Sequence, residues 1–527
     1  MEKNEKMRAA VEDLAARREK AREMGGPERV AKQHARGKMD VRQRIDALLD
    51  PGSFLELGMH AQHEGNLPEK QPKPSPADGC VTGIGALDGR PVAVAAYDFT
   101  VYGGSIGMVA EHKVTRLRDL ALKERLPIIW LVDSGGARLS ADGGMDPRAI
   151  SEFAGTGYLF REQSILSGVI PQVAAMVGPG AAGTAYIPGL ADFVPMVKEQ
   201  SSMAIGGPYL TKSVVGEDVT EEELGGSKVH TEKSGVADLQ VKDDAACIQA
   251  IKDYLSYFPS SCTEKPPRGA TRVEPDSLID DEILDIIPEN RRRAYDMRKI
   301  LKLVVDEGVL FEMKPKWARN ITTAFARIDG WPVGIVANNP QYYGGILDVD
   351  SADKAARFVN LCDSFNIPLC FFQDVPGFMV GTKVEQAGII RHGAKMLQAV
   401  SLATVPKLTV VVRKAYGAGY YVMNGRAYEP DLLVSWPGGE ISVMGAEGMV
   451  AIAAQKLLAA AENPEEIKEQ LAAGIRPYID INQVAAMGHV DDVIDPRETR
   501  TVLAKALLYT RNKTVERPWR KGPVRPV

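Results

Sequence analysis

The chain has 527 residues, of which 45% are hydrophobic and 25% are charged, and its formal net charge is −5. This composition is ordinary for a globular protein, and the slightly acidic charge balance gives no indication of nucleic-acid binding. No run of about 18 apolar residues is present, so no membrane-spanning helix is predicted, and the charged N-terminus predicts no secretory signal.

The use of cysteine and histidine argues against metal chemistry. The five cysteines are odd in number and form no C-x-x-C pair. This pattern favours reduced thiols in the cytoplasm and argues against a structural zinc site. The seven histidines are scattered and lack the H-E-x-x-H arrangement. We therefore expect no metal ion in this chain.

The first fifty residues are predicted to be helical. Val41, Ile45 and Leu48 lie at helical spacing, and the Asp-Pro-Gly sequence at 50–52 ends the helix. Beyond this point, short apolar runs alternate with amphipathic segments, which predicts βαβ units and a mostly parallel sheet. The expected strands are 91–96, 127–132 and 171–177, followed later in the chain by 332–337, 368–372 and 407–412.

These two sets of strands belong to an internal duplication. The segment 88–92 (Asp-Gly-Arg-Pro-Val) recurs as 329–333 (Asp-Gly-Trp-Pro-Val), at an offset of 241 residues (329 − 88). The same offset carries the Tyr-Gly-Gly sequence at 102–104 onto 343–345. Solenoid repeats are only about 20–50 residues long, so this pattern indicates a duplicated domain.

The duplication predicts an α/β protein with two domains of one fold. Residues 1–265 form the first domain and residues 276–527 the second, and the segment 259–275, rich in Pro, Ser and Thr, joins them. Each half is long enough to bury a sizeable core. The basic, proline-containing tail from Arg511 is expected to be an extended arm.

The third strand of each half leads into a loop of small residues. The first loop contains Ala182 and Gly183, and the second contains Ala418 and Gly419, at an apparent offset of 236 (418 − 182). Small residues let a ligand approach the backbone, and free N–H groups at a helix start suit a developing oxyanion. One such donor contributes about 3–4 kcal/mol in a transition state. The matched loops predict two such sites, although tight helix–sheet packing also selects Gly and Ala.

Candidate substrate-binding residues lie in the loops that follow the other strands. These residues are small and occur near strand ends in both halves: Gly135, Gly136, Ala137, Gly344, Gly345 and Gly377. They could form walls of the same cleft. Ordinary turns between strands and helices select the same residue types, so this alternative stays open.

Three short motifs match other enzyme classes. The glycines in 178–183 fit G-x-G-x-x-G, but Pro195 is a poor residue for the central strand that a dinucleotide-binding unit needs. Ser105 lies in a G-x-S-x-G nucleophile pattern, but its counterpart in the repeat is Ile346. Lys395 lies in a poor match to the biotin-attachment sequence. None of these three classes is favoured.

At these residues the chain resembles a known family, the carboxyltransferase (β) subunits of biotin-dependent acyl-CoA carboxylases. The resemblance covers nearly the whole length. Its motifs are specific as a set, and each would be weak alone: 26–29 (Gly-Pro-Glu-Arg), 32–34 (Lys-Gln-His), 98–100 (Asp-Phe-Thr), 135–138 (Gly-Gly-Ala-Arg), 223–226 (Glu-Leu-Gly-Gly), 374–378 (Asp-Val-Pro-Gly-Phe), 392–395 (His-Gly-Ala-Lys) and 442–445 (Ser-Val-Met-Gly).

The resemblance implies a fold and a mechanism. The family fold consists of two crotonase-like halves, each a β-β-α superhelix. Carboxybiotin on a separate carrier protein releases carbon dioxide, the biotin ureido anion takes the α-proton of an acyl-CoA thioester, and the enolate attacks the carbon dioxide. By position, Ala182 and Gly183 match the family's oxyanion pair for the thioester, and Ala418 and Gly419 match the pair for the biotin oxygen.

The resemblance also implies partners. Biotin carboxylase and biotin carboxyl carrier functions would come from another subunit, because this chain shows neither an ATP site nor a biotinyl lysine. In the family, the active site forms between the first half of one subunit and the second half of another, within a hexamer of β subunits. The first domain would carry the acyl-CoA side and the second domain the biotin side.

The identity of the acyl group stays open. Tyr421 stands where propionyl-type members have Asp, which favours a longer, branched or unsaturated acyl-CoA, as in methylcrotonyl-CoA carboxylases. Tyr420 and Val422 instead match the propionyl pattern. Three alternatives to the carboxylase remain: a decarboxylase of the same fold, a biotin-independent crotonase-type hydratase or hydrolase that uses Ser105 or an acidic residue, and a non-catalytic assembly subunit.

Overall fold

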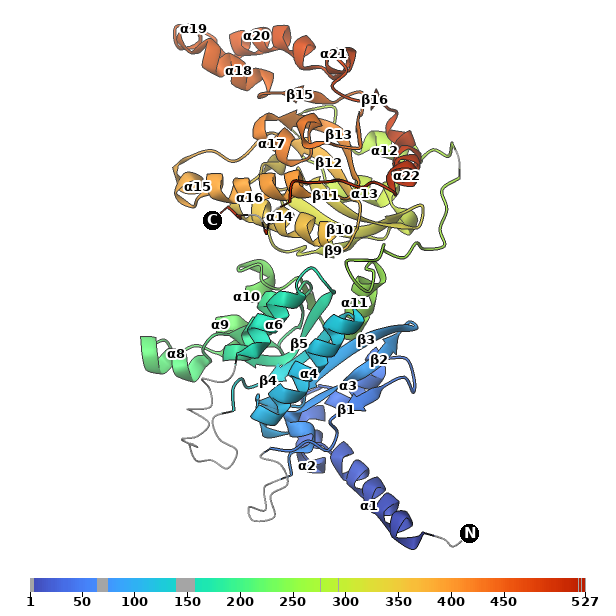
Figure 1. Cartoon of the computed structure of the whole chain (residues 1–527). Coiled ribbons are helices and arrows are strands. Elements are labelled where there is room, and N and C mark those ends of the chain that lie inside the picture. The colour runs from blue at the N-terminus through green and yellow to red at the C-terminus, as the bar shows by residue number, and fades with distance from the viewer. Residues whose placement is uncertain are drawn as a thin grey trace. The chain divides into compact units, whose positions relative to one another are not determined.

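The computed structural model describes residues 4–63, 74–138, 157–274, 276–291, 293–519, 521–522 and 524–526. The chain divides into two compact units, Met1–Glu264 and Lys265–Val527 (Figure 1). Within the described residues, each unit contains one eight-stranded sheet. Among the helices that the structure describes, none combines the length and the apolar character needed to span a bilayer.

The sheet of the first unit has the strand order β1-β2-β3-β4-β5-β6-β8, and β7 pairs with β5. Its strands are β1 (Leu55–Leu57), β2 (Cys80–Leu87), β3 (Arg90–Tyr97), β4 (Ile128–Ser134), β5 (Gln172–Ala181), β6 (Pro195–Val197), β7 (Ser202–Ala204) and β8 (Leu239–Val241). Its helices are α1 (Glu5–Arg22), α2 (Pro27–His34), α3 (Val41–Leu48), η1 (Pro76–Gly79), η2 (Tyr102–Gly104), α4 (Met108–Glu124), α6 (Tyr158–Leu166), η4 (Ala182–Ala185), α7 (Tyr186–Leu190), α8 (Pro208–Val215), α9 (Glu221–Gly225), α10 (Ser227–Glu232) and α11 (Asp244–Ser256).

The second sheet has the order β16-β14-β13-β12-β11-β10-β9, and β15 pairs with β13. Its strands are β9 (Phe311–Met313), β10 (Ile321–Ile328), β11 (Trp331–Asn338), β12 (Leu369–Val375), β13 (Lys407–Tyr416), β14 (Leu432–Ser435), β15 (Glu440–Ser442) and β16 (Asp492–Val493). Its helices are α12 (Glu282–Asp285), α13 (Met297–Val304), η5 (Asp306–Gly308), η6 (Tyr343–Gly345), α14 (Val349–Ser364), α15 (Thr382–Gln386), α16 (Ile389–Leu402), α17 (Gly417–Val422), η7 (Arg426–Tyr428), α18 (Ala446–Ala453), α19 (Gln455–Ala459), α20 (Pro464–Ile479), α21 (Ile481–Ala486), η8 (Pro496–Glu498) and α22 (Thr499–Thr510).

The six predicted strands are present as β3, β4, β5, β11, β12 and β13, and these pair in parallel within each triplet. Four strands on the antiparallel side of the two sheets, β1, β2, β9 and β10, were not predicted. A two-residue turn at Asp88 and Gly89 joins β2 to β3, and both residues have positive φ, 50° and 76°. An Asp-Gly pair with this geometry is a strong hairpin signal. Each sheet is therefore mixed, with a parallel centre and an antiparallel edge.

Alternate residues of each strand face opposite helical layers, because successive strand side chains point to opposite faces. In the first unit, Ala93, Trp130 and Met176 share one core with Val114 and Leu117 of α4. Figure 1 shows α4 and α6 lying over this face of the sheet. Helices α3 and α11 contact β3 and β5. The strands are thus covered on both faces, and their carboxyl ends remain as the edge at which loops can build a site.

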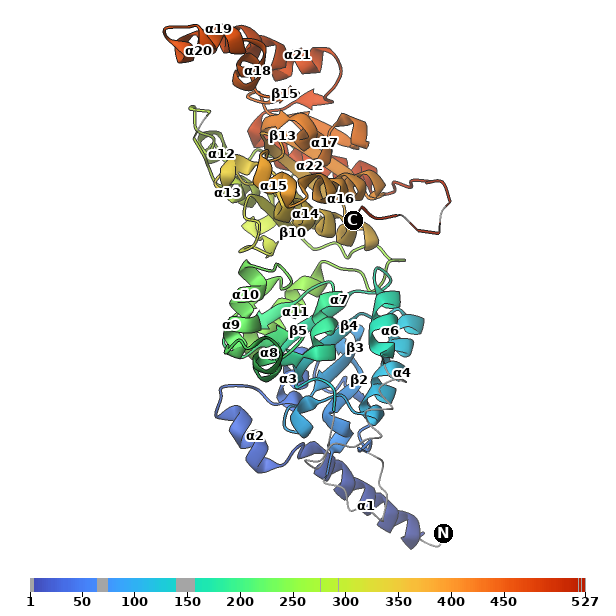
Figure 2. The same ribbon diagram turned by 90° about the vertical axis from the view of Figure 1, so that its left-hand side faces the viewer.

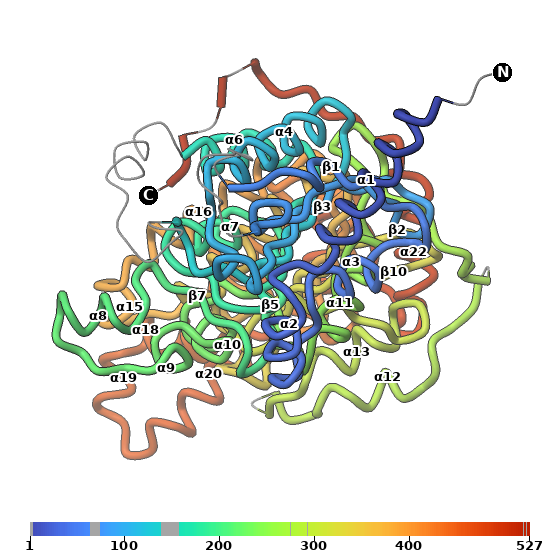
Figure 3. The backbone as a smooth tube through the Cα atoms, turned by 90° about the horizontal axis from the view of Figure 1, so that it is seen from below, coloured from blue at the N-terminus to red at the C-terminus, as the bar shows by residue number. Residues whose placement is uncertain are grey.

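Some segments extend beyond these layered cores. Within the second unit, α18 to α21 form a separate group beside β15 (Figure 2). At the start of the chain, α1 runs away from the sheet of the first unit, and Ala21 is its only buried residue among those described (Figure 3). At the other end, the tail after α22 contains no helix or strand among its described residues, and the carbonyl of Val524 accepts a hydrogen bond from Gln398 on α16.

One lysine in each unit, half-buried in the first and buried in the second, secures the segment that leads into the first long strand. The Lys113 Nζ donates to the carbonyls of Ala77 and Cys80, at 2.9 and 2.7 Å. Its counterpart Lys354 (354 − 113 = 241) is 2% exposed. The Lys354 ammonium donates to four carbonyls, those of Lys314, Trp317, Ala318 and Ile321, at 2.9–3.3 Å. Each ammonium thus gathers several carbonyls of one segment, and those of Lys314 and Ala318 also accept from the N–H groups of Trp317 and Ile321.

Candidate functional site

The third central strand of each unit ends in a helix start built from small residues. β5 ends at Ala181 and η4 begins at Ala182, whereas β13 ends at Tyr416 and α17 begins at Gly417. Ala182 and Gly417 both have positive φ, 52° and 58°. The first N–H groups of a helix have no intrahelical acceptor, so each loop presents donors at the carboxyl edge of its sheet.

The structure corrects the predicted offset between these loops. Strand pairing matches Ser134 with Gly180 in the first unit and Val375 with Ala415 in the second. The third strands therefore correspond at an offset of 235 (415 − 180), and the predicted offset of 236 is wrong by one residue. Ala182 corresponds to Gly417, and Gly183 corresponds to Ala418. Both loops contain the sequence Ala-Gly. The residue with positive φ is the first residue of the first pair, Ala182, but it is Gly417, the residue before the pair, in the second loop.

In the first unit the predicted residues lie together. A Cβ on Gly136 would lie 2.8 Å from the carbonyl oxygen of Ala181, so the loops after β4 and β5 are in contact. The N–H of Gly135 donates to the carbonyl of Gly103, and the N–H of Gly136 donates to Ser134 Oγ. Since both donors are already engaged, Gly135 and Gly136 are suited to form a wall rather than an anion site.

Ala137 ties the same wall to the loop after β3. It forms an isolated parallel bridge with Ile106, whose N–H donates to the carbonyl of Gly136 at 2.8 Å. A corresponding bridge joins Leu347 to Phe378 in the second unit, where the N–H of Leu347 donates to the carbonyl of Gly377. The loops after the first two central strands are thus linked in the same way in both units.

The predicted residues of the second unit also lie together. A Cβ on Gly419 would be 2.7 Å from Val375 Cγ2 and 3.1 Å from Gly377 Cα, and a Cβ on Gly345 would be 2.6 Å from the Asp374 carbonyl oxygen. Only glycine fits at these two positions without a shift of the neighbouring loop. Gly344, in the same η6 turn as Gly345, has open space around it and a φ of 65°. The loops after β11, β12 and β13 therefore pack against one another.

Tyr421 lies at the exposed end of this second group. It is 46% exposed, its ring lies 6.1 Å from that of Tyr428, and its neighbour Tyr420 accepts a hydrogen bond from the N–H of Arg426. Tyr421 corresponds to Tyr186 of the first unit (421 − 186 = 235), which is 49% exposed. Both third loops thus carry a half-exposed tyrosine one turn after the helix start.

Ser105 is not arranged as a nucleophile. Its hydroxyl donates to the carbonyl of Tyr102 at 2.7 Å and accepts from Arg138 Nε at 3.1 Å. Arg138 is itself ion-paired with the buried Asp78. A serine nucleophile needs a base as the acceptor of its proton, and here a carbonyl occupies that position. This geometry disfavours the hydrolase alternative that relied on Ser105.

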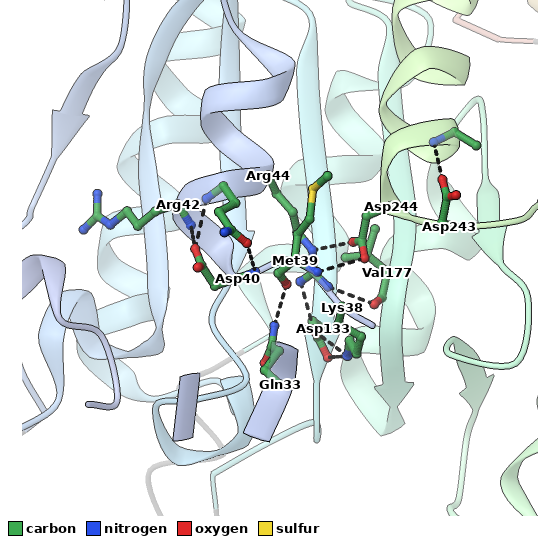
Figure 4. A network of polar contacts seen from close by, with 12 residues as sticks. Gln33, Lys38, Met39, Asp40, Arg42, Arg44, Asp133, Val177, Asp243 and Asp244 are labelled. Carbon is green, nitrogen blue, oxygen red and sulfur yellow. Dashed lines mark hydrogen bonds and ion pairs between the residues drawn. The ribbon is translucent and has the colours of Figure 1, made fainter. Parts of the chain in front are cut away.

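A buried ionic network behind the first loop was missed from the sequence (Figure 4). Asp133, at the end of β4, is fully buried and contacts both Lys38 and Arg44, at 2.7 and 2.9 Å. Arg44 also contacts Asp244 at 2.6 Å. Burial lowers the pKa of Lys38. The sequence separations reach 200 residues, and the one visible signal was an aspartate at the same strand end in both halves.

The second unit has a smaller network at the equivalent aspartate. Asp374 is fully buried, accepts from Arg413 Nε at 2.9 Å and accepts from the hydroxyl of Tyr295 at 2.8 Å. Burial raises the pKa of Asp374, and the guanidinium of Arg413 opposes that shift. Next to the loop, the hydroxyl of Tyr416 donates to the buried Glu440 of β15. Burial raises the pKa of Tyr416 to about 12, so its phenol is a donor at neutral pH.

The chemistry available in the two loops at the helix starts is that of backbone amides and small side chains. The described residues include no group of three or more His, Cys, Asp or Glu side chains placed to hold a metal ion. All five cysteines carry free thiols, and four of them are buried. The candidate site is therefore suited to stabilising negative charge on a ligand oxygen by N–H donation.

Residues 32–524 match the model of the carboxyl transferase domain family. The propionyl-CoA carboxylase carboxyltransferase subunit of Haloferax mediterranei is 42% identical over 516 residues, which cover 98% of each chain. The methylmalonyl-CoA decarboxylase subunit alpha of Propionigenium modestum is 41% identical, over 97% of this chain and 98% of that protein. The crystal structure of a transcarboxylase 12S hexamer with methylmalonyl-CoA bound has a TM-score of 0.91 at 43% identity, over 98% of each chain.

The chain belongs to the carboxyl transferase family. This membership confirms the resemblance found in the sequence, and the match to the 12S structure confirms the fold of two duplicated crotonase-like halves. The predicted class of enzyme, a transferase of carboxyl groups on acyl-CoA, is confirmed as well.

Proposed function

We propose that this chain is the carboxyltransferase subunit of a biotin-dependent acyl-CoA carboxylase. It would transfer a carboxyl group from carboxybiotin, held on a separate carrier protein, to a carbon of an acyl-CoA thioester. The observation that carries this proposal is the pair of equivalent helix starts at Ala182 and Gly417, whose loops contain Ala182–Gly183 and Ala418–Gly419. One loop would serve the thioester oxygen and the other the biotin oxygen.

Each loop would act on an oxygen that becomes more negative during the reaction. Removing the α-proton of a thioester places charge on its carbonyl oxygen, and the N–H groups of Ala182 and Gly183 are candidates to stabilise it. Such donors favour the transition state over the ground state, so they raise the turnover number more than the affinity. Gly135, Gly136 and Ala137 would form the wall beside this oxygen.

The second loop fits the ureido group of biotin. Ala418 and Gly419 offer amide donors, and their side chains are no larger than a methyl group, so a flat ring can approach the backbone. Gly345 packs against the end of β12, and Gly377 packs against Gly419, while Gly344 has open space beside it and is a candidate to contact the ligand. When bound, carboxybiotin supplies the activated carboxyl group. The residues of this chain orient it and hold its oxygen.

We further propose that the site is completed by a second copy of the chain within a hexamer. Five exposed apolar side chains follow strand ends around the second loop: Tyr343, Val380, Ile390, Tyr421 and Val443. Exposed apolar groups of this kind mark interaction surfaces. The first unit of another copy would cover them, so that the acyl-CoA side and the biotin side come from different subunits, in a reducing compartment such as the cytoplasm.

The first acyl group to test is propionyl, supplied in its carboxylated form as methylmalonyl-CoA, since relatives of about 40% identity carry propionyl-CoA and methylmalonyl-CoA in their names. The competing hypothesis is the longer or branched acyl group that Tyr421 suggests. The purified chain should be incubated with free biotin and malonyl-, methylmalonyl-, 3-methylglutaconyl- and glutaconyl-CoA, and loss of carboxylate followed by mass spectrometry. We expect biotin-dependent turnover of methylmalonyl-CoA. Turnover without biotin would refute the proposal.

A decarboxylase is the second candidate, supported by the likeness to the Propionigenium modestum subunit. The same loops would serve either direction, because the reaction is reversible. The partner decides between them: co-purification with a biotin carboxylase would support carboxylation, whereas co-purification with a membrane-embedded complex would support decarboxylation. A non-catalytic assembly subunit would bind none of the CoA esters.

A further inference from the structure

Arg44 lies at a gap in the strand pairing of the first sheet. β4 and β5 pair regularly up to Val132 and Met176 and then resume at Ser134 and Gly180, so one residue of β4 faces three of β5. The residues in the gap are Asp133 on one strand and Val177 to Pro179 on the other. Irregularities of this kind interrupt the backbone ladder and leave groups without their usual partners.

The guanidinium of Arg44 lies in this gap together with the ammonium of Lys38, which also contacts Asp133 (Figure 4). Arg44 donates to Asp133 Oδ2 at 2.9 Å and to the carbonyl of Val177 at 3.2 Å, and it therefore joins the two strands at the point where their pairing is interrupted. Its Nε donates to Asp244 Oδ1 at 2.6 Å, which fixes the guanidinium from the other side. The side chain of Arg44 is 1% exposed.

The two strand ends held by Arg44 lead directly into the proposed thioester site. Ser134 to Ala137 follow Asp133, and the loop to Ala182 and Gly183 follows Val177. There is no free volume at the join, because a Cβ on Gly178 would overlap Asp133 and lie 2.8 Å from Lys38 Nζ. A shift of the guanidinium would therefore be transmitted to both loops.

We propose that Arg44 is a positioning residue that sets the spacing between the acyl-CoA loop and its wall. This inference rests on the proposed function, because it assigns to Arg44 the alignment of the N–H donors at Ala182 and Gly183. Arg44 does not touch the substrate in this proposal. It acts through Asp133 and the carbonyl of Val177.

The test compares Arg44→Lys with a matched control, Arg118→Lys. Arg118 is also 1% exposed and also pairs with two carboxylates, Glu111 and Glu162, but it lies on α4 and contacts neither strand end. Lysine keeps the charge and removes the fork that bridges two strands. The readouts are turnover number and KM for biotin-dependent decarboxylation of methylmalonyl-CoA, together with amide hydrogen exchange of residues 178–183.

We expect Arg44→Lys to lower the turnover number by about 10- to 100-fold with a KM change below about threefold, because misplaced donors are felt in the transition state. We also expect faster exchange in 178–183. Arg118→Lys should change the turnover number of the folded protein by less than about twofold. An unchanged turnover number in Arg44→Lys, or an equal loss in Arg118→Lys, would overturn the proposal.

Two further arms keep the outcome decisive. If Arg44→Lys does not fold, Asp244→Asn replaces it. This variant keeps the Arg44–Asp133 pair and removes the negative charge of the side chain that holds Arg44 Nε and the N–H of Met39. An unchanged turnover number and exchange rate would then overturn the proposal. If the wild-type protein decarboxylates no ester, the proposed function fails. The exchange measurement still tests the positioning role, which is refuted if residues 178–183 exchange at the same rate in both arginine variants.

Discussion

The two units fill the same gap in their sheets with cations from different places. In the first unit, Arg44 reaches the gap from α3, and Gly178 on β5 leaves room for the carboxylate of Asp133 and the ammonium of Lys38. In the second unit, the position equivalent to Gly178 is Arg413 itself (413 − 178 = 235), which donates to Asp374. The residue equivalent to Arg44 is the buried Ile300 (300 − 44 = 256).

The difference shows which feature of the duplicated fold both copies require. Both units have the interrupted pairing and the buried aspartate, whereas the cation occupies unrelated positions. The requirement is thus for a guanidinium between the strand ends and not for an arginine at one position. In the first unit, the cation comes from α3, so the loops are connected to the N-terminal helices. In the second unit, the cation comes from β13 and the second partner of Asp374 is Tyr295, so the contacts stay within the sheet and the segment before α13.

The largest expected effect comes from removing the two aspartate charges in turn. We expect Asp133→Asn to lower the free energy of unfolding of the first unit by about 3–5 kcal/mol, because Lys38 loses its paired carboxylate and Arg44 keeps only Asp244. Asp374→Asn should cost the second unit only about 1–3 kcal/mol, since one guanidinium and one neutral phenol are affected. Amide exchange in denaturant, read separately for each unit, measures both values. Equal losses of unfolding free energy in the two units would show that the second cation beside Asp133 contributes nothing to stability.

The next expected effect is a stabilisation that depends on pH. Burial raises the pKa of Asp98 to about 6, and its counterpart in the second unit is the neutral Asn339 (339 − 98 = 241). An aspartate with a raised pKa in the folded state stabilises the protein below its unfolded pKa of 3.8 and loses that contribution as the pH rises through about 6. Asp98→Asn should therefore raise the free energy of unfolding at pH 8 by about 2–3 kcal/mol.

The gain from Asp98→Asn should shrink as the pH falls toward 4, and denaturant titrations at both pH values will measure it. Asn keeps an oxygen that can accept from the N–H and hydroxyl of Thr100, as Asp98 does. A gain that is the same at pH 4 and pH 8 would contradict the assignment to ionisation.

A smaller effect is expected from adding one methyl group at Gly178. We expect Gly178→Ala to cost about 1–3 kcal/mol, because the new Cβ overlaps the carboxylate of Asp133. Gly189→Ala is the matched control, since no atom lies within 4 Å of its Cβ position. It should be neutral or stabilising by about 0.4–1 kcal/mol. Thermal unfolding of both variants provides the comparison, and an equal response at the two positions would argue against a filled gap.

The smallest expected effect concerns substrate choice at the second loop. Tyr421→Asp should shift the ratio of kcat/KM between branched and propionyl-type esters by about tenfold, which is a typical discrimination for a small change in a pocket. Tyr421→Phe keeps the ring and should leave the ratio unchanged. The panel of CoA esters described above supplies the measurement, and an unaltered preference in Tyr421→Asp would exclude Tyr421 as a specificity residue.

Much of the architecture could be predicted because the repeat and the strand patterns are local signals. The six central strands were found from apolar runs that begin near Pro or Lys, and the offset of 241 holds for the first two strands and the turns between them. The one-residue error at the third loop arose because Ala-Gly occurs in both copies. Only the backbone conformation reveals that Ala182 corresponds to Gly417.

The ionic networks could not be predicted, because the sequence does not show which distant charges meet. Arg44 and Asp244 lie 200 residues apart, and the position equivalent to Arg44 in the other half holds Ile300, not an arginine. Asp133 and Asp374 occupy equivalent strand ends, and this match was visible in the sequence. It did not indicate an ionic network, because aspartate is also common in ordinary turns between a strand and a helix. The repeat was found from residues that are identical in the two halves. Equivalent positions that differ, such as Gly178 and Arg413, show where the ionic networks of the two units differ, and a search for identical residues does not find them.

Lys354 has a consequence for the order in which the second unit assembles. Its four carbonyl acceptors lie between Lys314 and Ile321, whereas the lysine is part of α14. The β9–β10 connection therefore reaches its native shape only after that helix docks. An exposed hairpin of two strands is marginally stable alone. The β9–β10 connection is thus stabilised by a contact from a residue distant in sequence. The hairpin and α14 are therefore expected to fold together in one cooperative step.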